Sequence, residues 1–380
     1  MKKGGKMKKL LTILLVLILG VSLAACGSGK PSGGDEPTGG ETEEKTLDNV
    51  KVAIFCSSVR GDSGIQDMIA DVGEEMIAAG NKDCAVYEVG DTAADQAKLK
   101  SQLLDVLEVG YDIIISSGST MCAILGDEGI AAEYPDVKFC LFDTTYDFDT
   151  YPSPNVYSAS FKANEGSYLA GIVAMAMAEN GTIGFVGGQE ISSIEDFCYG
   201  YVEGAKSVNP DGKILITFTN DWYDNALAKQ TTISEIEAGA TVVFPACGPS
   251  QAGVYEGAYD KQTWAIGCDE DREILYKKDH PEWVPFLLTS EIKDVYAAAK
   301  RAIAKTLDGT LEYGKAESLG LDTGCVGLIE TGNYANLPDN VKALVEAAKQ
   351  ACLDGSLKIT SAYGRTADQF NELRAWANNE

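Results

Sequence analysis

Two short loops in the second half of the chain carry side chains suited to binding a small polar molecule. The first loop, Asp221-Trp222-Tyr223-Asp224, contains an indole between carboxylates. The second loop is Asp269-Glu270-Asp271, and Glu273 follows it closely. An indole stacks on flat rings, and an ionised carboxylate accepts strong hydrogen bonds from hydroxyl groups. Each loop follows an apolar run that predicts a strand, at residues 213–219 and 263–267. The two loops therefore favour ligand recognition by stacking and hydrogen bonding.

Both loops also have a plainer interpretation. The acidic run from Asp269 to Glu273 is a possible calcium site, but it lacks the glycine and the distant glutamate of an EF-hand loop. Trp222 is a possible core residue, although its polar neighbours favour a loop. The sequence predicts no metal site, and it predicts that Trp222 contacts a ligand.

One motif suggests a hydrolase. Gly61-Asp62-Ser63-Gly64 is similar to the nucleophile motif of trypsin-like proteases and to the start of GDSL-type esterases. Both classes need a histidine as general base. His280 is the only histidine of the chain, and residues 277–282 around it are typical of a solvated turn. We therefore expect that the protein is not an enzyme.

Composition limits the partners further. The 380 residues include 31 Lys plus Arg against 57 Asp plus Glu, which gives a formal net charge of −26. Nucleic acids and anionic membrane surfaces bind clustered cations, so neither is an expected partner. Gly187-Gly188 follows a predicted strand but lacks the G-x-G-x-x-G pattern, and no cofactor is predicted. No feature predicts an obligate oligomer, and we expect a monomer.

The N-terminus has the layout of an export signal. Five lysines lie within Met1–Lys9, and residues 10–23 are mostly apolar, which is short for a membrane span. Leu23-Ala24-Ala25-Cys26 is similar to the lipobox of bacterial lipoproteins. The resemblance implies cleavage of residues 1–25, lipid attachment at Cys26, and a location on the extracytoplasmic face of the cell membrane. An ordinary secretory signal with a chance cysteine is the alternative.

The segment after Cys26 is polar. Residues 27–48 are rich in Gly, Ser, Pro, Thr and Glu, so they cannot bury enough apolar surface to offset their ordering entropy. We expect residues 26–48 to form a flexible tether. Nine further cysteines follow, several of them within apolar runs, and there is no C-x-x-C pair. Those cysteines are predicted to be small buried apolar residues, and their disulfide state stays open.

From Val50 onward, short β-branched runs alternate with longer amphipathic runs. The first series ends near Phe161, and a second series starts after Asn164. Such alternation predicts parallel sheets covered by helices on both faces. We therefore expect an α/β fold of two doubly wound lobes joined by a hinge. The predicted lobes are residues 49–161 plus about 273–320, and residues 162–272 plus about 321–380.

Several segments together resemble one protein family. The family is the basic membrane protein family of substrate-binding lipoproteins, and the segments occur here in the order found in that family. They are residues 111–115 and 133–139, Glu165-Gly166-Ser167-Tyr168-Leu169-Ala170-Gly171, residues 183–188, and Ala265-Ile266-Gly267-Cys268-Asp269-Glu270-Asp271. The likeness spans roughly residues 50–330. It implies a type I periplasmic-binding-protein fold, delivery of a ligand to an ABC importer, and a nucleoside ligand, preferentially a purine nucleoside.

The resemblance also implies a binding site. Asp62-Ser63-Gly64-Ile65-Gln66-Asp67 is similar to the first-strand motif of the family, and Trp222 corresponds to its stacking aromatic residue. Gly248 corresponds to a glycine of the family that contacts the ligand through its backbone. Asp269 corresponds to the carboxylate that binds ribose, and Lys293 to the lysine that neutralises this carboxylate. The candidate ligand-binding residues are Asp62, Ile65, Gln66, Asp67, Ser119, Trp222, Gly248, Asp269 and Lys293.

Two positions depart from the family pattern. Ile65 stands where the family has a second stacking phenylalanine, and Gln66 stands where it has asparagine. The segment Ser116-Ser117-Gly118-Ser119 is also more polar than the Gly-x-Gly-Phe of the family. These departures leave open which base is bound. They also leave open a surface sensor outside transport, or a receptor for a sugar or another small polar molecule.

Overall fold

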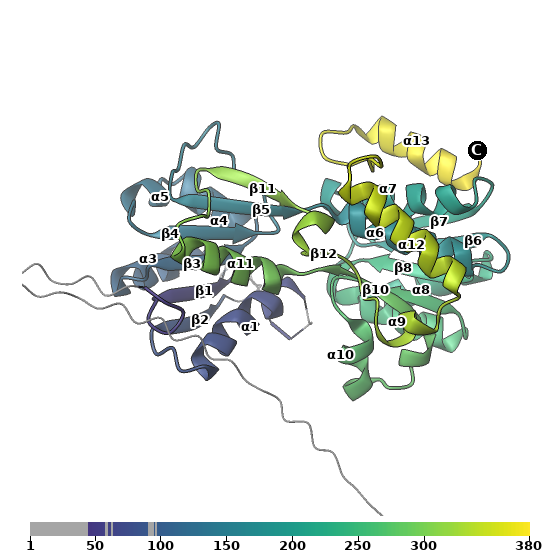
Figure 1. Cartoon of the computed structure of the whole chain (residues 1–380), viewed down its shortest axis with the longest axis horizontal. Coiled ribbons are helices and arrows are strands. Elements are labelled where there is room, and N and C mark those ends of the chain that lie inside the picture. Colours follow the sequence, from purple (N-terminus) through teal and green to yellow (C-terminus); the bar gives the residue numbers. More distant parts are fainter. Residues whose placement is uncertain (1–44, 58–59, 62–63, 90–94, 96) are drawn as a thin grey trace, which may run out of the picture. The chain divides into compact units, whose positions relative to one another are not determined.

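The computed structural model describes residues 45–380, apart from residues 58–59, 62–63, 90–94 and 96. The predicted signal segment, Cys26, most of the tether and Asp62 lie outside the described residues. Two six-stranded sheets organise the described chain, and each has helices on both faces (Figure 1). The predicted α/β class with two sheet-based lobes is therefore confirmed.

The first sheet is parallel throughout, in the order β11-β5-β4-β3-β1-β2. Its strands are β1 (Val52–Cys56), β2 (Cys84–Glu88), β3 (Ile113–Ser117), β4 (Lys138–Phe142), β5 (Val156–Phe161) and β11 (Lys315–Leu319). Continuous apolar strands such as β1 suit this position, because both of their faces are covered by helices.

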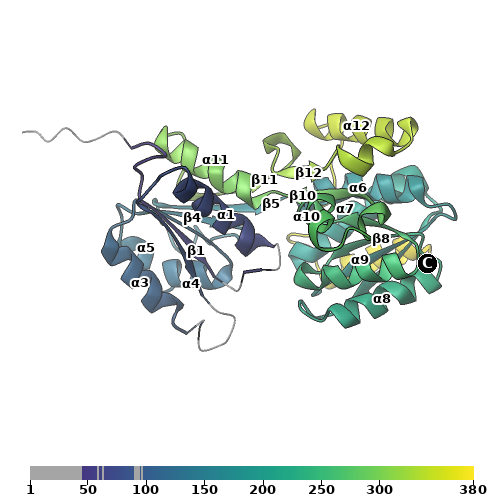
Figure 2. The ribbon, with the colours of Figure 1, turned by 90° about the horizontal axis from the view of Figure 1, so that it is seen from below.

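Side chains of the first sheet alternate between two apolar clusters. Ile54 and Ile115 pack with α1 (Ile65–Ala78) and α11 (Val295–Leu307). Phe55 and Ile114 belong to the cluster on the other face, whose helices are α3 (Leu99–Val109), α4 (Ser119–Gly126) and α5 (Ile130–Glu133). Figure 2 shows these two helical layers above and below the strands.

The second sheet has the order β12-β10-β9-β8-β6-β7, and only β12 runs antiparallel to its neighbour. Its strands are β6 (Thr182–Gly187), β7 (Lys213–Phe218), β8 (Val242–Ala246), β9 (Trp264–Gly267), β10 (Leu287–Lys293) and β12 (Val326–Leu328). One face packs on α6 (Ala163–Met177), α7 (Ser192–Val208), α12 (Asp339–Leu353) and α13 (Ala367–Asn378). The other packs on α8 (Asn225–Glu237), α9 (Gln251–Asp260) and α10 (Arg272–Asp279).

The chain passes between the sheets three times: from β5 to α6, from β10 to α11, and from β11 to β12. The structure differs here from the return to the first lobe predicted near residue 273. Strand β10 pairs with β9, and α10 packs on the second sheet. An apolar run does not reveal which of two sheets it will join. We therefore propose residues 295–320, rather than 273–320, as the returning segment of the first lobe.

Helices α6 and α7 approach each other closely through glycine. A Cβ atom at Gly204 would lie 2.0 Å from the carbonyl oxygen of Tyr168, and one at Gly171 would lie 2.2 Å from the carbonyl oxygen of Tyr201. Backbone atoms cannot move aside as a flexible side chain can. Glycine at these positions thus sets how near the two helices come.

We expect Gly204→Ala to lower the free energy of unfolding by about 1–3 kcal/mol or more, because the added methyl group forces the helices apart. Urea denaturation followed by circular dichroism measures the change. Gly327→Ala in β12 is the control, since its Cβ would meet no atom closer than 3.7 Å. Equal losses in the two variants would contradict the packing argument.

All nine cysteines of the described chain are free, and seven of them are buried. Burial raises the pKa of thiols such as Cys84, to about 11, so these side chains are protonated at neutral pH. This agrees with the prediction that they are small apolar core residues. No helix among the described residues is both long and apolar enough to span a bilayer.

Candidate functional site

A cavity of about 340 Å³ lies where loops from both sheets converge. Most of its lining residues follow the carboxyl ends of strands, which is where open α/β sheets bind ligands. The lining consists of Gly64, Ile65, Gln66, Asp143, Ile191, Ser193, Ile194, Phe197, Trp222, Tyr223, Ala246, Gly248, Pro249, Gln251, Cys268, Asp269 and Lys293. We refer to this cavity as the central pocket.

A larger hollow of about 530 Å³ shares Asp269 with the central pocket. Its lining includes the further carboxylates Asp71, Glu270, Asp271 and Asp294, and no lysine or arginine. The central pocket instead combines three aromatic side chains, a lysine and two carboxylates. This mixture of apolar surface with a few converging polar groups is typical of small-molecule sites. We therefore take the central pocket as the candidate site.

The indole of Trp222 packs against the backbone of two neighbouring loops, at Gly188 and Gly248. A Cβ atom at Gly188 would come within 2.4 Å of the indole, and Gly248 has a φ of +57° with its would-be Cβ 3.2 Å from the ring. The backbone N–H of Ser250 donates to the carbonyl oxygen of Trp222 at 2.8 Å. One side of the indole is thus held against backbone, while the ring also lines the central pocket.

The loop that carries Trp222 is ordered by its own carboxylates. Asp221 accepts hydrogen bonds from the N–H groups of Tyr223 at 2.7 Å and Asp224 at 2.8 Å, and these bonds lower the pKa of Asp221. Asp224 in turn caps α8 by accepting from the N–H of Leu227 at 2.8 Å. The polar neighbours of Trp222 therefore form the turn that positions the ring.

Asp269 adopts a left-handed backbone conformation directly after β9, with a φ of +68°. Its carbonyl oxygen accepts from the N–H of Lys293 at 3.0 Å, and the Arg272 guanidinium donates to the carbonyl oxygen of Cys268 at 2.8 Å. A non-glycine residue with such a φ is uncommon and is held here by its surroundings. The Asp269 carboxylate is aimed at the pocket, and its Oδ1 atom is buried with no hydrogen-bond partner.

Lys293, at the end of β10, joins the two lobes. Its Nζ lies 3.2 Å from Oδ1 of Asp143 and 3.8 Å from Oδ1 of Asp269, and it lies 5.5 Å from the centre of the Phe197 ring. Burial opposes the lysine charge, but the two carboxylates outweigh that effect and raise the pKa of Lys293. The ammonium group is therefore charged and fixed between Asp143, in the first lobe, and Asp269, in the second.

Gln66 is held at the start of α1. Its Oε1 accepts from the N–H of Ser57 at 3.0 Å, and its Nε2 donates to Oγ of Ser117 at 2.9 Å. Ile65 precedes it, and both side chains line the central pocket. The first lobe thus contributes an aliphatic surface and an anchored amide to the pocket.

Two of the predicted site residues lie elsewhere. Asp67 points back to the preceding loop, where it accepts from the N–H of Gly61 at 2.9 Å and pairs with Arg60 at 3.3 Å. Ser119 is exposed as the first residue of α4. Neither residue lines the central pocket, and Asp62 lies outside the described residues. The other six predicted residues line the pocket, and their role in binding stays a prediction.

The sequence interpretation missed Asp143 and Phe197. Asp143 directly follows β4, so the rule that pointed to Asp269 could also have found it. Phe197 lies within α7, one turn beyond the pocket-lining Ser193. A phenylalanine in an amphipathic helix looks like any core residue, so no sequence signal marked it.

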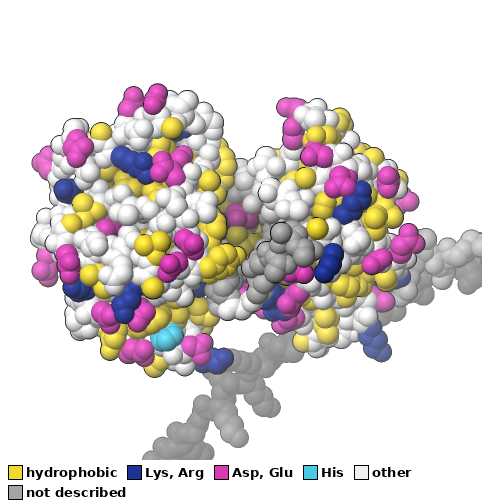
Figure 3. Space-filling model, turned by 180° about the vertical axis from the view of Figure 1, so that it is seen from behind, with side chains coloured by type: hydrophobic (Ala, Val, Ile, Leu, Met, Phe, Trp, Pro, Cys, Tyr) yellow, Lys and Arg dark blue, Asp and Glu magenta, His cyan; other side chains and the backbone are white. Residues whose placement is uncertain are grey.

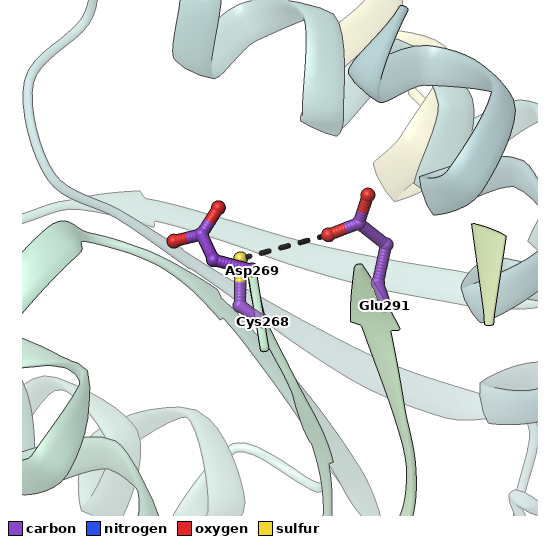
Figure 4. A group of neighbouring side chains, drawn as sticks. All are labelled: Cys268, Asp269 and Glu291. Carbon is purple, nitrogen blue, oxygen red and sulfur yellow. Dashed lines mark hydrogen bonds between the residues drawn. The ribbon is translucent and has the colours of Figure 1, made fainter. Parts of the chain in front are cut away.

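A third missed residue, Glu291, lies beneath the pocket. Glu291 is completely buried in β10, and its Oε2 lies 3.9 Å from Sγ of Cys268 (Figure 4). Burial raises the pKa of Glu291 well above its usual value, and the charge of Asp269 acts in the same direction. A buried acid next to a buried thiol is a second unusual feature of this site.

Glu270 makes the fold sensitive to pH. Burial, partly offset by Arg272, raises the pKa of Glu270 from 4.5 to about 7. Between these values the folded chain holds a proton that the unfolded chain releases, so the free energy of unfolding falls as the pH rises.

We expect Glu270→Gln to flatten this decline between about pH 5 and pH 7, because its amide stays neutral throughout. Urea denaturation at a series of pH values measures the slope for both chains. Buried acids such as Glu291 and Glu235 act in the same direction, so part of the slope persists. Identical slopes in the two chains would contradict the assignment to Glu270.

His280 lies away from the central pocket. Its ring stacks on Trp283 at 3.9 Å between ring centres, with 5° between the ring planes, and it is partly exposed at the surface (Figure 3). Its Nδ1 lies 3.3 Å from a carboxylate oxygen of Glu282. It lines none of the cavities around Asp269.

Sequence comparison agrees with this picture of a binding protein. Residues 49–362 match the family model described as ABC transporter substrate-binding protein PnrA-like. The CD4+ T-cell-stimulating antigen of Listeria innocua is 30% identical over 361 residues, which cover 92% of this chain and 97% of that protein. The ABC transporter nucleoside-binding protein BmpA of Lactococcus lactis is 34% identical over 66% of this chain and 72% of its own length.

The fold likewise resembles solved structures. A solute-binding protein of an ABC transporter system from Aeropyrum pernix superimposes with a TM-score of 0.70 at 23% identity, covering 87% of this chain and 99% of that one. At this identity the likeness concerns the fold. It agrees with the two-sheet architecture.

Proposed function

Because this chain belongs to the PnrA-like family of ABC transporter substrate-binding proteins, which bind solutes and are not enzymes, we propose that its central pocket binds a nucleoside, most readily a purine nucleoside. A relative from Lactococcus lactis carries the name nucleoside-binding protein. The observation on which the proposal rests is that one cavity holds both an indole and a buried carboxylate oxygen that accepts no hydrogen bond from the described chain.

The indole suits a flat base. Trp222 is supported from behind by Gly188 and Gly248, so a base stacked on its free side would meet a ring that is already in place. Stacking of a base on an aromatic side chain contributes about 1–3 kcal/mol. Ile65 would offer the base an aliphatic surface from the first lobe. An aliphatic side chain such as Ile65 discriminates less between ring shapes than an aromatic ring does, which suits a site that accepts more than one base.

The carboxylate suits a ribose. Oδ1 of Asp269 is buried and accepts no hydrogen bond in the described chain, and a buried acceptor without a donor is costly. A ribose hydroxyl would supply the missing donor, with a charge-assisted bond. Lys293 would balance the carboxylate charge at 3.8 Å, and the backbone at Gly248 would admit the sugar closely. Asp269 would thus select a vicinal diol.

Calorimetry with a panel of ribonucleosides tests the proposal, with the free bases and free ribose as controls. We expect heat of binding for at least one nucleoside, with dissociation in the micromolar range or tighter, and far weaker binding of its separate base and sugar. If no nucleoside binds more tightly than about millimolar, the proposal is wrong. Tight binding of a free sugar alone would identify a sugar receptor on the same fold.

Delivery to a permease would follow from closure of the two lobes. Lys293 already pairs with Asp143 of the first lobe and Asp269 of the second. A ligand that contacts both sides favours the arrangement in which both sets of contacts form. We propose that the liganded arrangement presents the surface that the ABC permease recognises. A surface sensor would use the same closure without transport.

We also propose that Cys26 carries a lipid that holds the mature chain on the extracytoplasmic face of the membrane. We expect bacterial cells fed an alkyne analogue of palmitate to label the full chain. Cys26→Ser should remove the label, whereas Cys352→Ser should keep it, because Cys352 belongs to the folded part. Label that persists in Cys26→Ser would contradict anchoring at this residue.

A further inference from the structure

Three potential metal ligands on two adjacent strands converge beside the central pocket, and two of them, Cys268 and Asp269, line it. Cys268 and Asp269 follow β9, and Glu291 belongs to β10. One ligand atom from each lies within 4.8 Å of the other two. Figure 4 shows the sulfur between the two carboxylates, with a Glu291 oxygen directed at it.

One oxygen of the buried Glu291 carboxylate has no hydrogen-bond partner in the described chain. Glu291 is 0% exposed, and its Oε1 accepts no hydrogen bond. That oxygen faces Gly166, where a Cβ would lie only 2.5 Å away. The carboxylate also contacts the backbone N–H of Asp269 and Sγ of Cys268, the latter at 3.9 Å from Oε2. Such a group is costly to bury, so a ligand that engages it would relieve a real penalty.

The charges near the cluster are also unbalanced. Lys293 is shared between Asp143 and Asp269, and the Arg272 Nε is committed to the carbonyl oxygen of Cys268. No lysine or arginine of the described chain lies within ion-pair distance of Glu291. A cation bound among the three ligand atoms would place a further positive charge between the carboxylates of Asp269 and Glu291.

We propose that Cys268, Asp269 and Glu291 form a binding site for a thiophilic divalent cation such as Zn²⁺. Sulfur ligands select Zn²⁺ and similar metals over Ca²⁺ and Mg²⁺, which prefer oxygen. On binding, the cysteine sulfur coordinates as thiolate and releases its proton to solvent, as does the Glu291 carboxyl if it is protonated.

The geometry is close to what a tetrahedral site needs. In such a site a sulfur and an oxygen ligand lie about 3.5 Å apart, compared with 3.9 Å between Sγ of Cys268 and Oε2 of Glu291. Three protein ligands leave one coordination position open. Because Cys268 and Asp269 also line the central pocket, this position would face the bound molecule or water. The inference does not depend on that molecule being a nucleoside.

Cobalt provides the test, because Co²⁺ replaces Zn²⁺ and reports a thiolate ligand by a near-ultraviolet charge-transfer band. The probe is the full chain carrying Cys26→Ser, treated with a chelator that is then removed. We expect one equivalent of Co²⁺ to produce the band and Zn²⁺ to abolish it by displacement. No thiolate band at up to about millimolar Co²⁺ would overturn the proposal and leave Glu291 as a neutral buried acid.

Variants assign the ligands. Cys268→Val, which keeps the side chain small and apolar, should lose the band. Glu291→Gln should weaken Co²⁺ binding by at least about tenfold, since even outer contacts to a metal site matter that much. Cys140→Val is the control: its thiol is equally buried but contacts the Tyr313 hydroxyl rather than a carboxylate, and the band should persist.

The possible results distinguish failure of the metal site from failure of the proposed function. A band that survives in Cys268→Val would overturn the site. If that variant fails to fold, a natively folded Glu291→Gln with unchanged Co²⁺ affinity would overturn it as well. Nucleoside calorimetry on the chelator-treated protein is a separate readout. The cobalt band without nucleoside binding would contradict only the proposed function, and nucleoside binding without the band would contradict only the metal site.

Discussion

Asp269→Asn is expected to weaken nucleoside binding by about 100-fold or more. Hydrogen bonds to a charged group contribute about 1.5–3 kcal/mol each, and the carboxylate is proposed to accept from two ribose hydroxyls. Asparagine keeps the shape and tolerates the φ of +68° at this position, so the loss reports the charge and the acceptor. Calorimetry on chelator-treated protein measures it.

Deoxynucleosides sharpen this prediction. The wild-type chain should bind a ribonucleoside much more tightly than its 2′-deoxy counterpart, and Asp269→Asn should lose most of that preference. Asp260→Asn is the control, because Asp260 pairs with Lys229 at 2.7 Å on the partly exposed surface of α9. Unchanged affinity in Asp269→Asn, or an equal loss in the control, would contradict the assigned role.

Trp222→Ala is expected to weaken binding between about fivefold and about 150-fold, which corresponds to the loss of one stacked base. The same variant separates ligand classes, since a receptor for a free sugar or a protein partner would lose much less. Trp222→Phe should recover most of the affinity, because it restores a ring over Gly188 and Gly248. Calorimetry with the nucleoside that binds best measures all three chains.

Trp264→Ala is the control for Trp222→Ala, because it removes a tryptophan that lies outside the pocket. Trp264 begins β9 and is 39% exposed, so its removal should leave affinity unchanged. Thermal unfolding of each variant shows whether truncation at residue 222 loosens the supporting loops. A natively folded Trp222→Ala with wild-type affinity would contradict stacking on this ring.

The local pattern of the sequence predicted most helices and strands, because each apolar run is short and is separated from the next by a polar turn. What it could not predict was sheet membership. The pattern did not predict β10, whose pairing with β9 adds it to the second sheet. The amphipathic pattern of residues 121–133 predicts one helix, but Gly129, with a φ of +77°, separates α4 from α5.

The candidate site was predictable to the extent that it follows strand ends. Trp222, Gly248 and Asp269 come directly after strands, and the structure places them on one cavity. Asp67 also lies close to a strand end, but a short-range contact with Arg60 turns it away. Nothing in the sequence indicated Glu291, because its burial depends on a long-range contact with Gly166, which is 125 residues away in the sequence.

The three passages of the chain between its sheets impose an order on folding. The first sheet lacks its edge strand β11, and one of its faces lacks α11, until residues 295–319 have been made. By then the central strands of the second sheet are complete. The half synthesised first therefore stays incomplete until most of the second half has been made. Until residues 295–319 are made, the apolar face that α11 covers lacks this helix, and exposed apolar faces make incomplete chains prone to aggregation.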